Sequence, residues 1–501
     1  MRLLHVTHEF PPYEFAGTAI YTYNIVRALS EKHEVFVFSR LSDKSVSDYK
    51  VMDEDRSGYK VRFMNKPELS WVPFEASYTD PRSEKIFLDY VDDVRPDVVH
   101  FQHLLGLSWT SVREVRKRGI AVVFTLHDFW AMCPMGQRMC YTDRSLCEEI
   151  NFDKCGPCVF GNGWTWTEEK PAGEDHDHGG HGDPSSNGTN HRHSAPGYSE
   201  FYDHRFRYTP GLWARRPRAA LWAMNKWFWG VFGAESEIHG QEAESKHPFA
   251  VRFRHMQEAV GEADLLITPS AFLREEFIRI FQVPPEKIVF SLNGMKFDHV
   301  TSHPATKSDV IRFGFVGSVI PTKGVHVLVE AAKKLKGVGG FRVDIYGAPN
   351  QWTESYRDDL VKSAEGFPNI QFKGRFDNKQ IGRVLAEVDV LVVPSIWYEN
   401  APLTLNEAAM TRTPVLMSDR GGMLEFHKTN AWGRTFKLGD PDDLAREMRR
   451  LIENPSEIPS LIGHEPYIKP VDVNARELSG YYERILLKQP VEFGPIATQR
   501  V

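Results

Sequence analysis

The chain has 501 residues, of which 41% are hydrophobic and 26% are charged, a balance typical of a globular protein with two or three domains. Its 61 Lys and Arg residues against 67 Asp and Glu residues give a formal net charge of −6, so we expect no nucleic-acid partner. No apolar run reaches the roughly 18 residues of a membrane span, and the apolar start is too short for a secretory signal. We therefore expect a cytoplasmic protein whose five cysteines are thiols or metal ligands rather than disulfides.

The first elements predict a βαβ unit. A buried strand near the start is followed by a loop with Gly17, an amphipathic helix over Ile20–Ser30 and a second strand, HEVFVFS. The loop lacks the G-x-G-x-x-G pattern of dinucleotide-binding domains, which disfavours a nicotinamide dehydrogenase.

Two further predicted strands, PDVVHFQH and IAVVFTLHD, carry His103 and His127 near their carboxyl ends. One such histidine is commonly only a satisfied boundary residue. Two histidines at neighbouring strand ends face the same crevice of a parallel sheet, which favours a functional role. Strands over 263–270 and 287–294 complete this first α/β domain.

Residues 133–247 fit neither domain and indicate an insertion. Its start holds all five cysteines, which are Cys133, Cys140, Cys147, Cys155 and Cys158. The spacing of Cys155 and Cys158 is that of a metal knuckle, and two of Cys133, Cys140 and Cys147 would complete a tetrahedral structural zinc site. Packed thiols without a metal are the alternative. The Gly- and His-rich residues 161–198 favour a solvated loop.

The insertion ends in a segment, 206–232, that interleaves basic and aromatic side chains. These side chains are Arg215, Arg216, Arg218, Lys226, Trp213, Trp222, Trp227 and Trp229. Such a mixture suits an anionic membrane surface or an acceptor platform. A helical hairpin that packs its tryptophans on the first domain is the equal alternative.

A polar linker over 297–308 leads to a second α/β domain that opens with IRFGFVGSVIPTKGVHVLVEAAKKL. Later, VDVLVVPSIWYENAPLTLNEAAM predicts a strand, a loop with Glu399, and a helix that begins after Pro402 and carries Glu407. The start of that helix, at Leu403 and Thr404, offers backbone N–H groups to an anion. An anion site between two carboxylates suits a sugar nucleotide, whose hydroxyls donate to carboxylates.

Three pieces of the chain together resemble the retaining glycosyltransferases of family 4. They are PSIWYENAPLTLNEA with TPVLMSDRGGMLE, which matches the family's E-x7-E block nearly throughout, FGFVGSVIPTKGVHVLVEA, and HEFPPYEFAGTA with TLHDFWAMCP. The resemblance covers 1–132 and 248–487. It implies an α/β fold of the GT-B type, with two Rossmann-like domains facing a cleft and the insertion in the N-terminal domain.

The expected boundaries follow from this resemblance. An N-terminal acceptor domain would cover 1–298, with the insertion at about 133–247, and a nucleotide-sugar-binding domain would cover 309–475. A last helix and tail over 476–501 would pack back on the N-terminal domain.

The resemblance also implies roles for the matching residues. Glu407 would hold the ribose hydroxyls of the donor, Glu399 would contact the donor sugar, and Lys323 would neutralise the diphosphate. His127 would reach the sugar near the reaction centre, so His127, Lys323 and Glu399 are the catalytic candidates. The backbone near the phosphates would come from Gly17, Gly317, Leu403 and Thr404. Many members carry an arginine where this chain has Ser318, which leaves one cation fewer but keeps a hydroxyl donor.

The implied reaction transfers a sugar, with retention of configuration and no metal cofactor, from a nucleotide-diphosphate sugar to a glycan or a lipid-linked acceptor. Peripheral attachment to the inner face of an anionic membrane is part of this expectation. A sugar-nucleotide epimerase or a phosphorylase on the same fold is one alternative. A non-catalytic sugar-nucleotide sensor is another, although the presence of all four of Glu399, Glu407, Lys323 and His127 argues against it.

Overall fold

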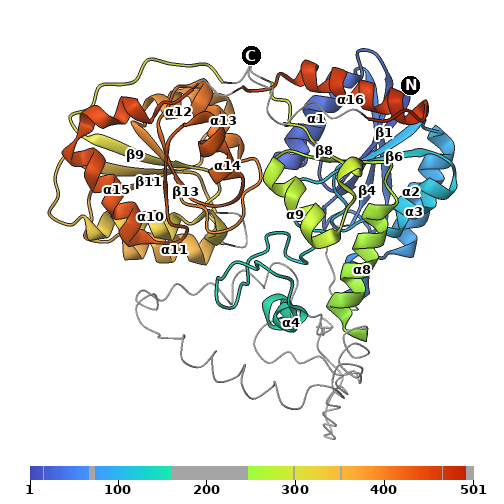
Figure 1. The fold of residues 1–501 in the computed structure, drawn as a ribbon, viewed down its shortest axis with the longest axis horizontal. Helices are drawn as coiled ribbons and strands as arrows, with labels where there is room; N and C mark the ends of the chain where they lie inside the picture. Colours follow the sequence, from blue (N-terminus) through green and yellow to red (C-terminus); the bar gives the residue numbers. More distant parts are fainter. Residues whose placement is uncertain are drawn as a thin grey trace, which may run out of the picture.

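The computed structural model describes residues 1–14, 16–66, 74–160, 246–296, 300–349, 353–464 and 467–491. Two α/β domains lie side by side, each built around its own sheet (Figure 1). The two-domain α/β architecture predicted from the sequence is confirmed.

The N-terminal domain contains an eight-stranded sheet with the order β3-β4-β2-β1-β5-β6-β7-β8. Its strands are β1 (Arg2–Thr7), β2 (Glu34–Leu41), β3 (Val51–Arg56), β4 (Tyr59–Asn65), β5 (Val98–Phe101), β6 (Ala121–Thr125), β7 (Leu265–Thr268) and β8 (Ile288–Phe290). Its helices are α1 (Gly17–Leu29), η1 (Phe74–Ser77), α2 (Pro81–Val94), α3 (Thr110–Lys117), α4 (Phe152–Phe160), α8 (Pro248–Gly261), α9 (Ala271–Phe281) and η2 (Pro285–Lys287). All neighbours pair in parallel except β3 with β4.

The C-terminal domain contains a six-stranded, fully parallel sheet with the order β11-β10-β9-β12-β13-β14. Its strands are β9 (Ile311–Val316), β10 (Phe341–Tyr346), β11 (Ile370–Gly374), β12 (Val390–Val393), β13 (Val415–Ser418) and β14 (Arg434–Phe436). Its helices are η3 (Pro321–Lys323), α10 (Val325–Lys334), α11 (Glu354–Ser363), η4 (Asn378–Gln380), α12 (Ile381–Ala386), α13 (Leu403–Met410), α14 (Gly421–Asn430), α15 (Pro441–Glu453) and η5 (Pro455–Leu461).

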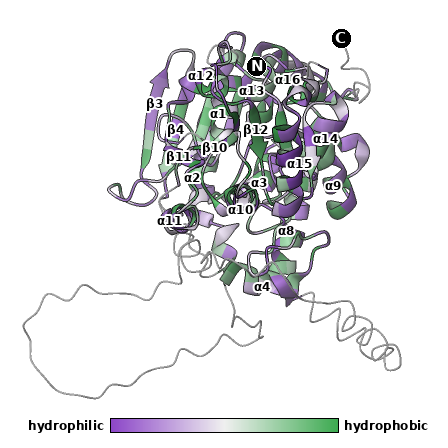
Figure 2. Ribbon diagram, turned by 90° about the vertical axis from the view of Figure 1, so that its left-hand side faces the viewer, coloured by the Kyte–Doolittle hydropathy of each residue, from purple (hydrophilic) through white to green (hydrophobic). Residues whose placement is uncertain are grey.

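The strand orders locate the binding edges. The order reverses between β1 and β5 in the first sheet and between β9 and β12 in the second. Open parallel sheets bind ligands at the carboxyl ends of the strands beside such a reversal. The central strands are mostly apolar and buried on both faces, and the helices outside them carry both hydrophilic and hydrophobic residues (Figure 2). Function is therefore expected in the loops after these four strands.

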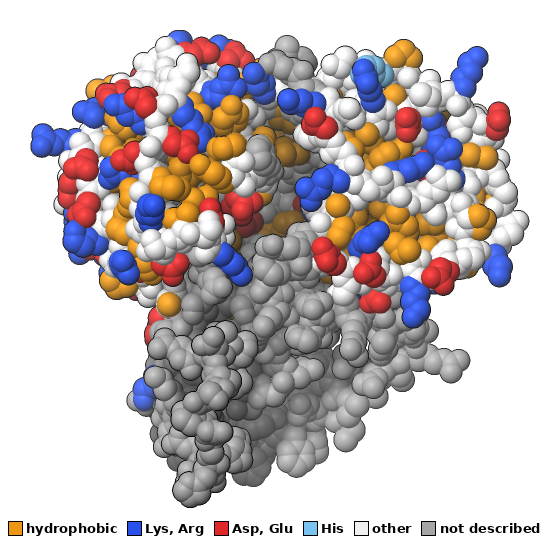
Figure 3. Space-filling model, turned by 180° about the vertical axis from the view of Figure 1, so that it is seen from behind, with side chains coloured by type: hydrophobic (Ala, Val, Ile, Leu, Met, Phe, Trp, Pro, Cys, Tyr) orange, Lys and Arg blue, Asp and Glu red, His pale blue; other side chains and the backbone are white. Residues whose placement is uncertain are grey.

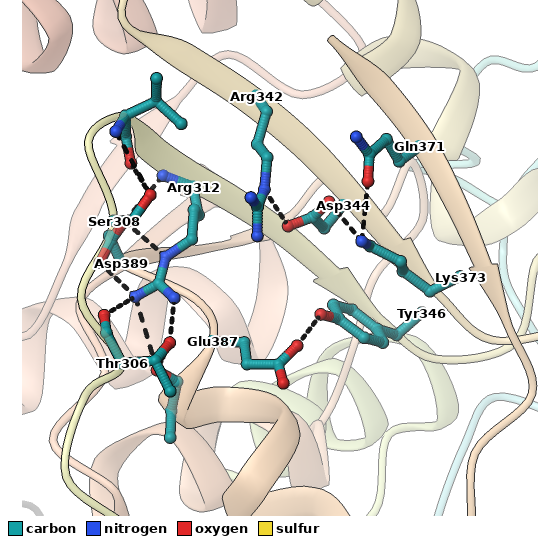
Figure 4. A network of polar contacts seen from close by, with 12 residues as sticks. Thr306, Ser308, Arg312, Arg342, Asp344, Tyr346, Gln371, Lys373, Glu387 and Asp389 are labelled. Atoms are coloured by element: carbon teal, nitrogen blue, oxygen red, sulfur yellow. Dashed lines mark hydrogen bonds and ion pairs between the residues drawn. The ribbon is translucent and has the colours of Figure 1, made fainter. Parts of the chain in front are cut away.

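A polar network anchors the linker before the second domain (Figure 4). The buried guanidinium of Arg312 donates to both carboxylate oxygens of Asp389, at 2.9 and 2.8 Å, and to the carbonyl of Thr306 at 3.0 Å. On the neighbouring strands, the fully buried carboxylate of Asp344 lies between Arg342, at 2.8 Å, and Lys373, at 3.4 Å. These charges are paired, as buried charges must be.

The last helix, α16 (Val471–Leu486), lies against α1 of the N-terminal domain, far from its neighbours in sequence (Figure 1). Asn474 accepts a hydrogen bond from the hydroxyl of Tyr21 at 3.0 Å, and the hydroxyl of Tyr482 lies 2.6 Å from His100 Nδ1. The chain thus returns to the first domain by Val471.

The described part of the insertion is 133–160 with 246–247. A short hairpin with a bridge between Met139 and Leu146 leads into α4. The hairpin's Arg138, only 1% exposed, lies 5.3 Å from the ring centroid of Tyr398 in the second domain. The predicted His-rich loop and the basic-aromatic segment lie outside the described residues. In the described ranges, no helix combines the length and apolar character that a membrane crossing requires.

Candidate active site

The loops after β6 and β12 meet between the domains. The side-chain amide of Asn400, in the loop after β12, donates to the backbone carbonyl of His127, in the loop after β6, at 3.0 Å. Figure 3 shows that the surface is hollowed between the two halves of the molecule. The two predicted binding edges are therefore adjacent.

Glu399 is the centre of a tight polar cluster on the C-terminal side. Its residue is only 4% exposed, and its Oε1 accepts three hydrogen bonds. The donors are Lys323 Nζ at 2.6 Å, Ser395 Oγ at 2.7 Å and the indole Nε1 of Trp397 at 3.0 Å. Lys323 Nζ also lies 5.7 Å from the ring centroid of Trp397, within cation–π range. The predicted catalytic candidates Lys323 and Glu399 are thus in direct contact.

Glycines make this cluster sterically feasible. Gly324 follows Lys323 with φ +70°, and a Cβ there would lie 1.8 Å from the carbonyl oxygen of Pro394. A Cβ at Gly422 would lie 1.7 Å from the carbonyl oxygen of Asn400, while its N–H donates to the Glu399 carbonyl at 2.6 Å. Any side chain at either position would separate the loops that hold Glu399.

Glu407 lies inside α13, at 6% exposure, beyond the helix start formed by Leu403 and Thr404. Burial raises the pKa of its carboxyl group to about 7. The helix has no side-chain cap at Pro402 within the described structure, and Leu403 and Thr404 are partly exposed. This end of α13 therefore has the character of the predicted anion site.

The glycine-rich loop after β9 lies beside this site. Gly317 has φ +149°. Its carbonyl oxygen packs closely against Gly347, where a Cβ would lie 1.8 Å from that oxygen. Ser318, which follows, is exposed. Gly17 begins α1 in the other domain, and a Cβ there would meet no described heavy atom within 4 Å. Packing alone therefore does not require a glycine at position 17.

His127 is held as a neutral imidazole. Its Nε2 lies 2.9 Å from the amide oxygen of Gln102, and burial lowers its pKa to about 3. Because an amide oxygen only accepts, Nε2 carries the hydrogen and Nδ1 is left as an acceptor. The ring also packs against Tyr21, with centroids 5.2 Å apart.

His103, the other strand-end histidine, lies beside it and contacts Asp128. Its Nε2 is 3.2 Å from Asp128 Oδ2, and its Nδ1 accepts from the backbone N–H of Leu105 at 3.0 Å. A small pocket at the carboxyl ends of β5 and β6 is lined by Gln102, His103, Asp128 and Trp130 among others. The two histidines thus share one crevice, as their strand positions predict.

The five cysteines lie in the hairpin, in α4 and just before them, and none of them forms a disulfide. Cys158 Sγ accepts from the backbone N–H of Tyr141 at 3.3 Å, which brings Cys158 beside Cys140. Within the described ranges, no three His, Cys, Asp or Glu side chains are arranged to hold a metal ion. The zinc site therefore stays a prediction.

Several residues of this site were not assigned a role from the sequence. Ser395, Trp397 and Asn400 flank Glu399, and Gln102 and Asp128 flank the strand-end histidines. Their nearness in sequence to Glu399, His103 and His127 was the available signal. Glu425 lacked even that signal: its carboxylate accepts from the N–H groups of Ala271 and Phe272, at 3.0 and 2.7 Å, in the other domain.

Comparison with known proteins agrees with this arrangement. Residues 301–463 match the family model of "Glycosyl transferases group 1", and residues 15–152 match that of "Glycosyltransferase Family 4". An uncharacterized glycosyltransferase of Methanocaldococcus jannaschii is 26% identical over 205 residues, 38% of this chain and 52% of the relative. The O-antigen chain mannosyltransferase B of Escherichia coli is 25% identical over 207 residues, 38% of this chain and 53% of the relative. The chain thus spans about half the length of these relatives.

Solved structures show the same fold over nearly the whole chain. Sucrose-phosphate synthase from Thermosynechococcus elongatus matches with a TM-score of 0.60 and 15% identity, covering 97% of this chain and 100% of that one. HepE from Anabaena, in complex with UDP and glucose, matches with a TM-score of 0.56 and 11% identity, covering 96% and 99%. The fold is GT-B, and both halves of the chain are homologous to glycosyltransferases.

Proposed function

We propose that this glycosyltransferase homologue moves a sugar, with retention of configuration, from a nucleotide-diphosphate sugar to a hydroxyl of a glycan or lipid-linked acceptor. The observation that carries the proposal is the contact of Lys323 with Glu399, four residues before the start of α13, with Glu407 buried in that helix. These groups lie after β9 and β12, at the strand reversal of the second sheet. The similarity to an O-antigen chain mannosyltransferase favours cell-surface polysaccharide or glycolipid as the product.

The charges suit departure of a nucleoside diphosphate. Breaking the bond between the sugar and the diphosphate places negative charge on the leaving oxygens. Lys323 and the N–H groups at Leu403 and Thr404 are the groups that would stabilise this charge. Ser318 would donate one further hydrogen bond, and the approach of the diphosphate would be over Gly317 and Gly17. In this proposal the positive charge comes from the protein, so no metal ion is required.

The carboxylates and the imidazole suit the hydroxyls of the donor. Glu407 would accept from both ribose hydroxyls, which would favour its ionised form despite its burial. Glu399 would accept from the donor sugar. Neutral His127 would also accept a sugar hydroxyl through Nδ1, since its Nε2–H is directed to Gln102. In the proposed reaction the acceptor hydroxyl attacks from the face that the diphosphate leaves, and the diphosphate takes its proton.

The test is turnover with a panel of sugar nucleotides. A thermal-shift screen identifies the donor, since a ligand at 100 times its Kd stabilises a protein by about 2.7 kcal/mol. Radiolabelled donor is then followed into product, with the anomeric configuration read by NMR. A glycoside product with the anomeric configuration of the donor sugar supports the proposal. An epimerised donor, a sugar phosphate, or tight donor binding without any turnover would replace it with the epimerase, phosphorylase or sensor function.

We also propose that the acceptor is presented at an anionic membrane by the segment 206–232. The support is its composition alone, because the segment lies outside the described residues. Changing Arg215, Arg216 and Arg218 together to Ser should reduce flotation with anionic liposomes and transfer to a lipid acceptor while leaving donor binding intact. Equal use of a soluble acceptor, with no flotation of the unchanged protein, would contradict membrane attachment.

A further inference from the structure

The carboxylate of Glu399 is unusually fixed for a group in a binding loop. All hydrogen bonds to it from the described residues go to Oε1, and they come from three chemically different donors: an ammonium, a hydroxyl and an indole. Oε2 receives none from the described part of the chain. One oxygen is therefore held by the protein, and the other is left to a ligand.

Two of these donors come from the same short loop as Glu399. Ser395 lies two residues after the end of β12 and is 1% exposed, and Trp397 follows two residues later with its ring beside Lys323. The spacing Ser-x-Trp-x-Glu lets a single turn of chain bring a hydroxyl and an indole N–H to one carboxylate oxygen. Neither donor competes for a phosphate as Lys323 does, because Ser395 is buried and the indole N–H is directed into the carboxylate.

We infer that Ser395 and Trp397 are positioning residues that hold Glu399 in place while Lys323 changes partner from Glu399 to the donor diphosphate. This inference rests on the proposed function. Without donor, the Lys323 ammonium and the Glu399 carboxylate neutralise each other at 2.6 Å. When a diphosphate attracts Lys323, two neutral donors remain on Oε1, so the carboxylate keeps its orientation toward the sugar hydroxyls. Ligand-independent orientation of this kind lowers the cost of reaching the reactive geometry.

The variants Ser395→Ala and Trp397→Phe each remove one donor and keep most of the volume. Each should lower kcat/KM by about tenfold, the usual worth of a hydrogen bond to a charged group. The change should fall mainly on kcat, because nucleotide binding does not involve Oε1. Ser395→Thr keeps the hydroxyl and should restore activity to within about threefold of the unchanged enzyme.

A double-mutant cycle separates positioning from simple loop damage. In the Glu399→Gln background the carboxylate is already lost, so Ser395→Ala and Trp397→Phe should add little further loss. Two matched controls lie in the same domain. Ser418 ends the next strand, is fully buried, and its Oγ has no partner in the described structure, so Ser418→Ala should be neutral. Trp432→Phe removes an indole hydrogen bond to the Thr413 carbonyl, 3.3 Å long, which does not touch Glu399.

The outcomes distinguish this inference from the proposed function. An unchanged enzyme without turnover on any sugar nucleotide would overturn the proposed function. Two results in an active wild-type enzyme would overturn only the positioning role. One is that Ser395→Ala and Trp397→Phe are as active as the wild-type enzyme. The other is that each lowers kcat/KM in the Glu399→Gln background by the same factor as in the wild-type background. Crystal structures of the Ser395→Ala/Trp397→Phe variant with the nucleoside diphosphate bound, so that Lys323 is no longer paired with Glu399, give a readout independent of activity. A Glu399 carboxylate that stays in its present orientation there would also overturn it, and a carboxylate in a new or disordered orientation would support it.

Discussion

The side-chain amide of Asn400 donates to the backbone carbonyl of His127 across the two domains, at 3.0 Å. Asn400 directly follows Glu399, and both are almost fully buried. One hydrogen bond thus connects the loop that holds the proposed donor-binding carboxylate to the loop that holds the proposed catalytic histidine. The relative position of the two groups depends on how the domains sit against each other.

Asn400→Ala should therefore impair the reaction more than nucleotide binding. We expect kcat to fall by about tenfold, from loss of a hydrogen bond worth about 1 kcal/mol and looser alignment of His127. The Kd for the bare nucleoside diphosphate should stay within twofold, since the ribose and phosphate contacts are proposed on Glu407, Lys323 and α13. Calorimetry with the nucleotide and steady-state kinetics check both statements. A weaker nucleotide Kd with normal kcat would assign Asn400 to binding instead.

Lys323→Ala should lower kcat by about 100-fold or more, because negative charge grows on the diphosphate only as the sugar leaves. The donor KM should change much less. Lys334→Ala is a matched control: its ammonium forms an exposed pair with Asp442 at 2.7 Å at the far end of α10. If Lys323→Ala raised KM and left kcat intact, the lysine would bind the ground state only.

Glu407→Gln should reveal how much the burial of an ionised carboxylate lowers the free energy of unfolding. Burial raises its folded pKa to about 7 from an ordinary value of 4.5. The folded state then binds more protons than the unfolded state between these values, so stability falls as pH rises from about 4.5 to 7. Glutamine removes this penalty, so the variant should be more stable than the unchanged protein at pH 8, by on the order of 3 kcal/mol, and the gain should vanish near pH 4.5.

The same substitution should weaken donor binding by roughly 1.5–3 kcal/mol, because an amide oxygen replaces a charged acceptor for the ribose hydroxyls. Denaturant melts at several pH values and calorimetry with the donor test the two effects separately. A stability difference that does not vary with pH would mean that Glu407 is not buried as a titrating group. Unchanged donor affinity would remove it from the ribose site.

The sequence predicted the parts of this site that depend on local pattern. The strand end and the helix start after Pro402 placed Glu399 and Glu407 in one strand–loop–helix unit. The resemblance to family 4 added Lys323, which the structure has in contact with Glu399. The contacts of Asn400 with His127 and of Glu425 with Ala271 join residues far apart in the chain. No periodicity or spacing encodes such contacts, because they depend on how two separately folded domains pack. The last helix begins at Val471, whereas the predicted C-terminal helix and tail began at 476. The reason is the same, because the contacts of the helix with the N-terminal domain determine where the second domain ends.

The cysteines allow a direct test of the zinc prediction. Protein purified without chelators should carry about one equivalent of zinc by elemental analysis, and Cys155→Ser with Cys158→Ser should abolish it. Zinc binding would require the thiols to turn from their present arrangement toward one point. Metal-free protein with unchanged thermal stability in the presence of chelator would establish packed thiols.

Glu425 should couple the domains through the start of α9. Its carboxylate accepts from the N–H groups of Ala271 and Phe272, while Ser270, at the N-cap of the same helix, accepts from Leu273 at 3.2 Å. The first N–H groups of a helix have no partner within the helix, and these two side chains accept from them. Glu425→Ala and Ser270→Ala should therefore each lower the free energy of unfolding by about 1 kcal/mol.

Only Glu425→Ala removes a link between the domains, since Ser270 belongs to the same domain as α9. We therefore expect small-angle X-ray scattering to show a larger radius of gyration for Glu425→Ala and an unchanged one for Ser270→Ala. Glu425→Gln keeps one acceptor oxygen and should lie between Glu425→Ala and the unchanged protein. If both alanine variants scatter like the wild-type protein, the Glu425 contact caps α9 without holding the domains together. The contact between the domains then depends on Asn400 and on the packing of Arg138 against Tyr398.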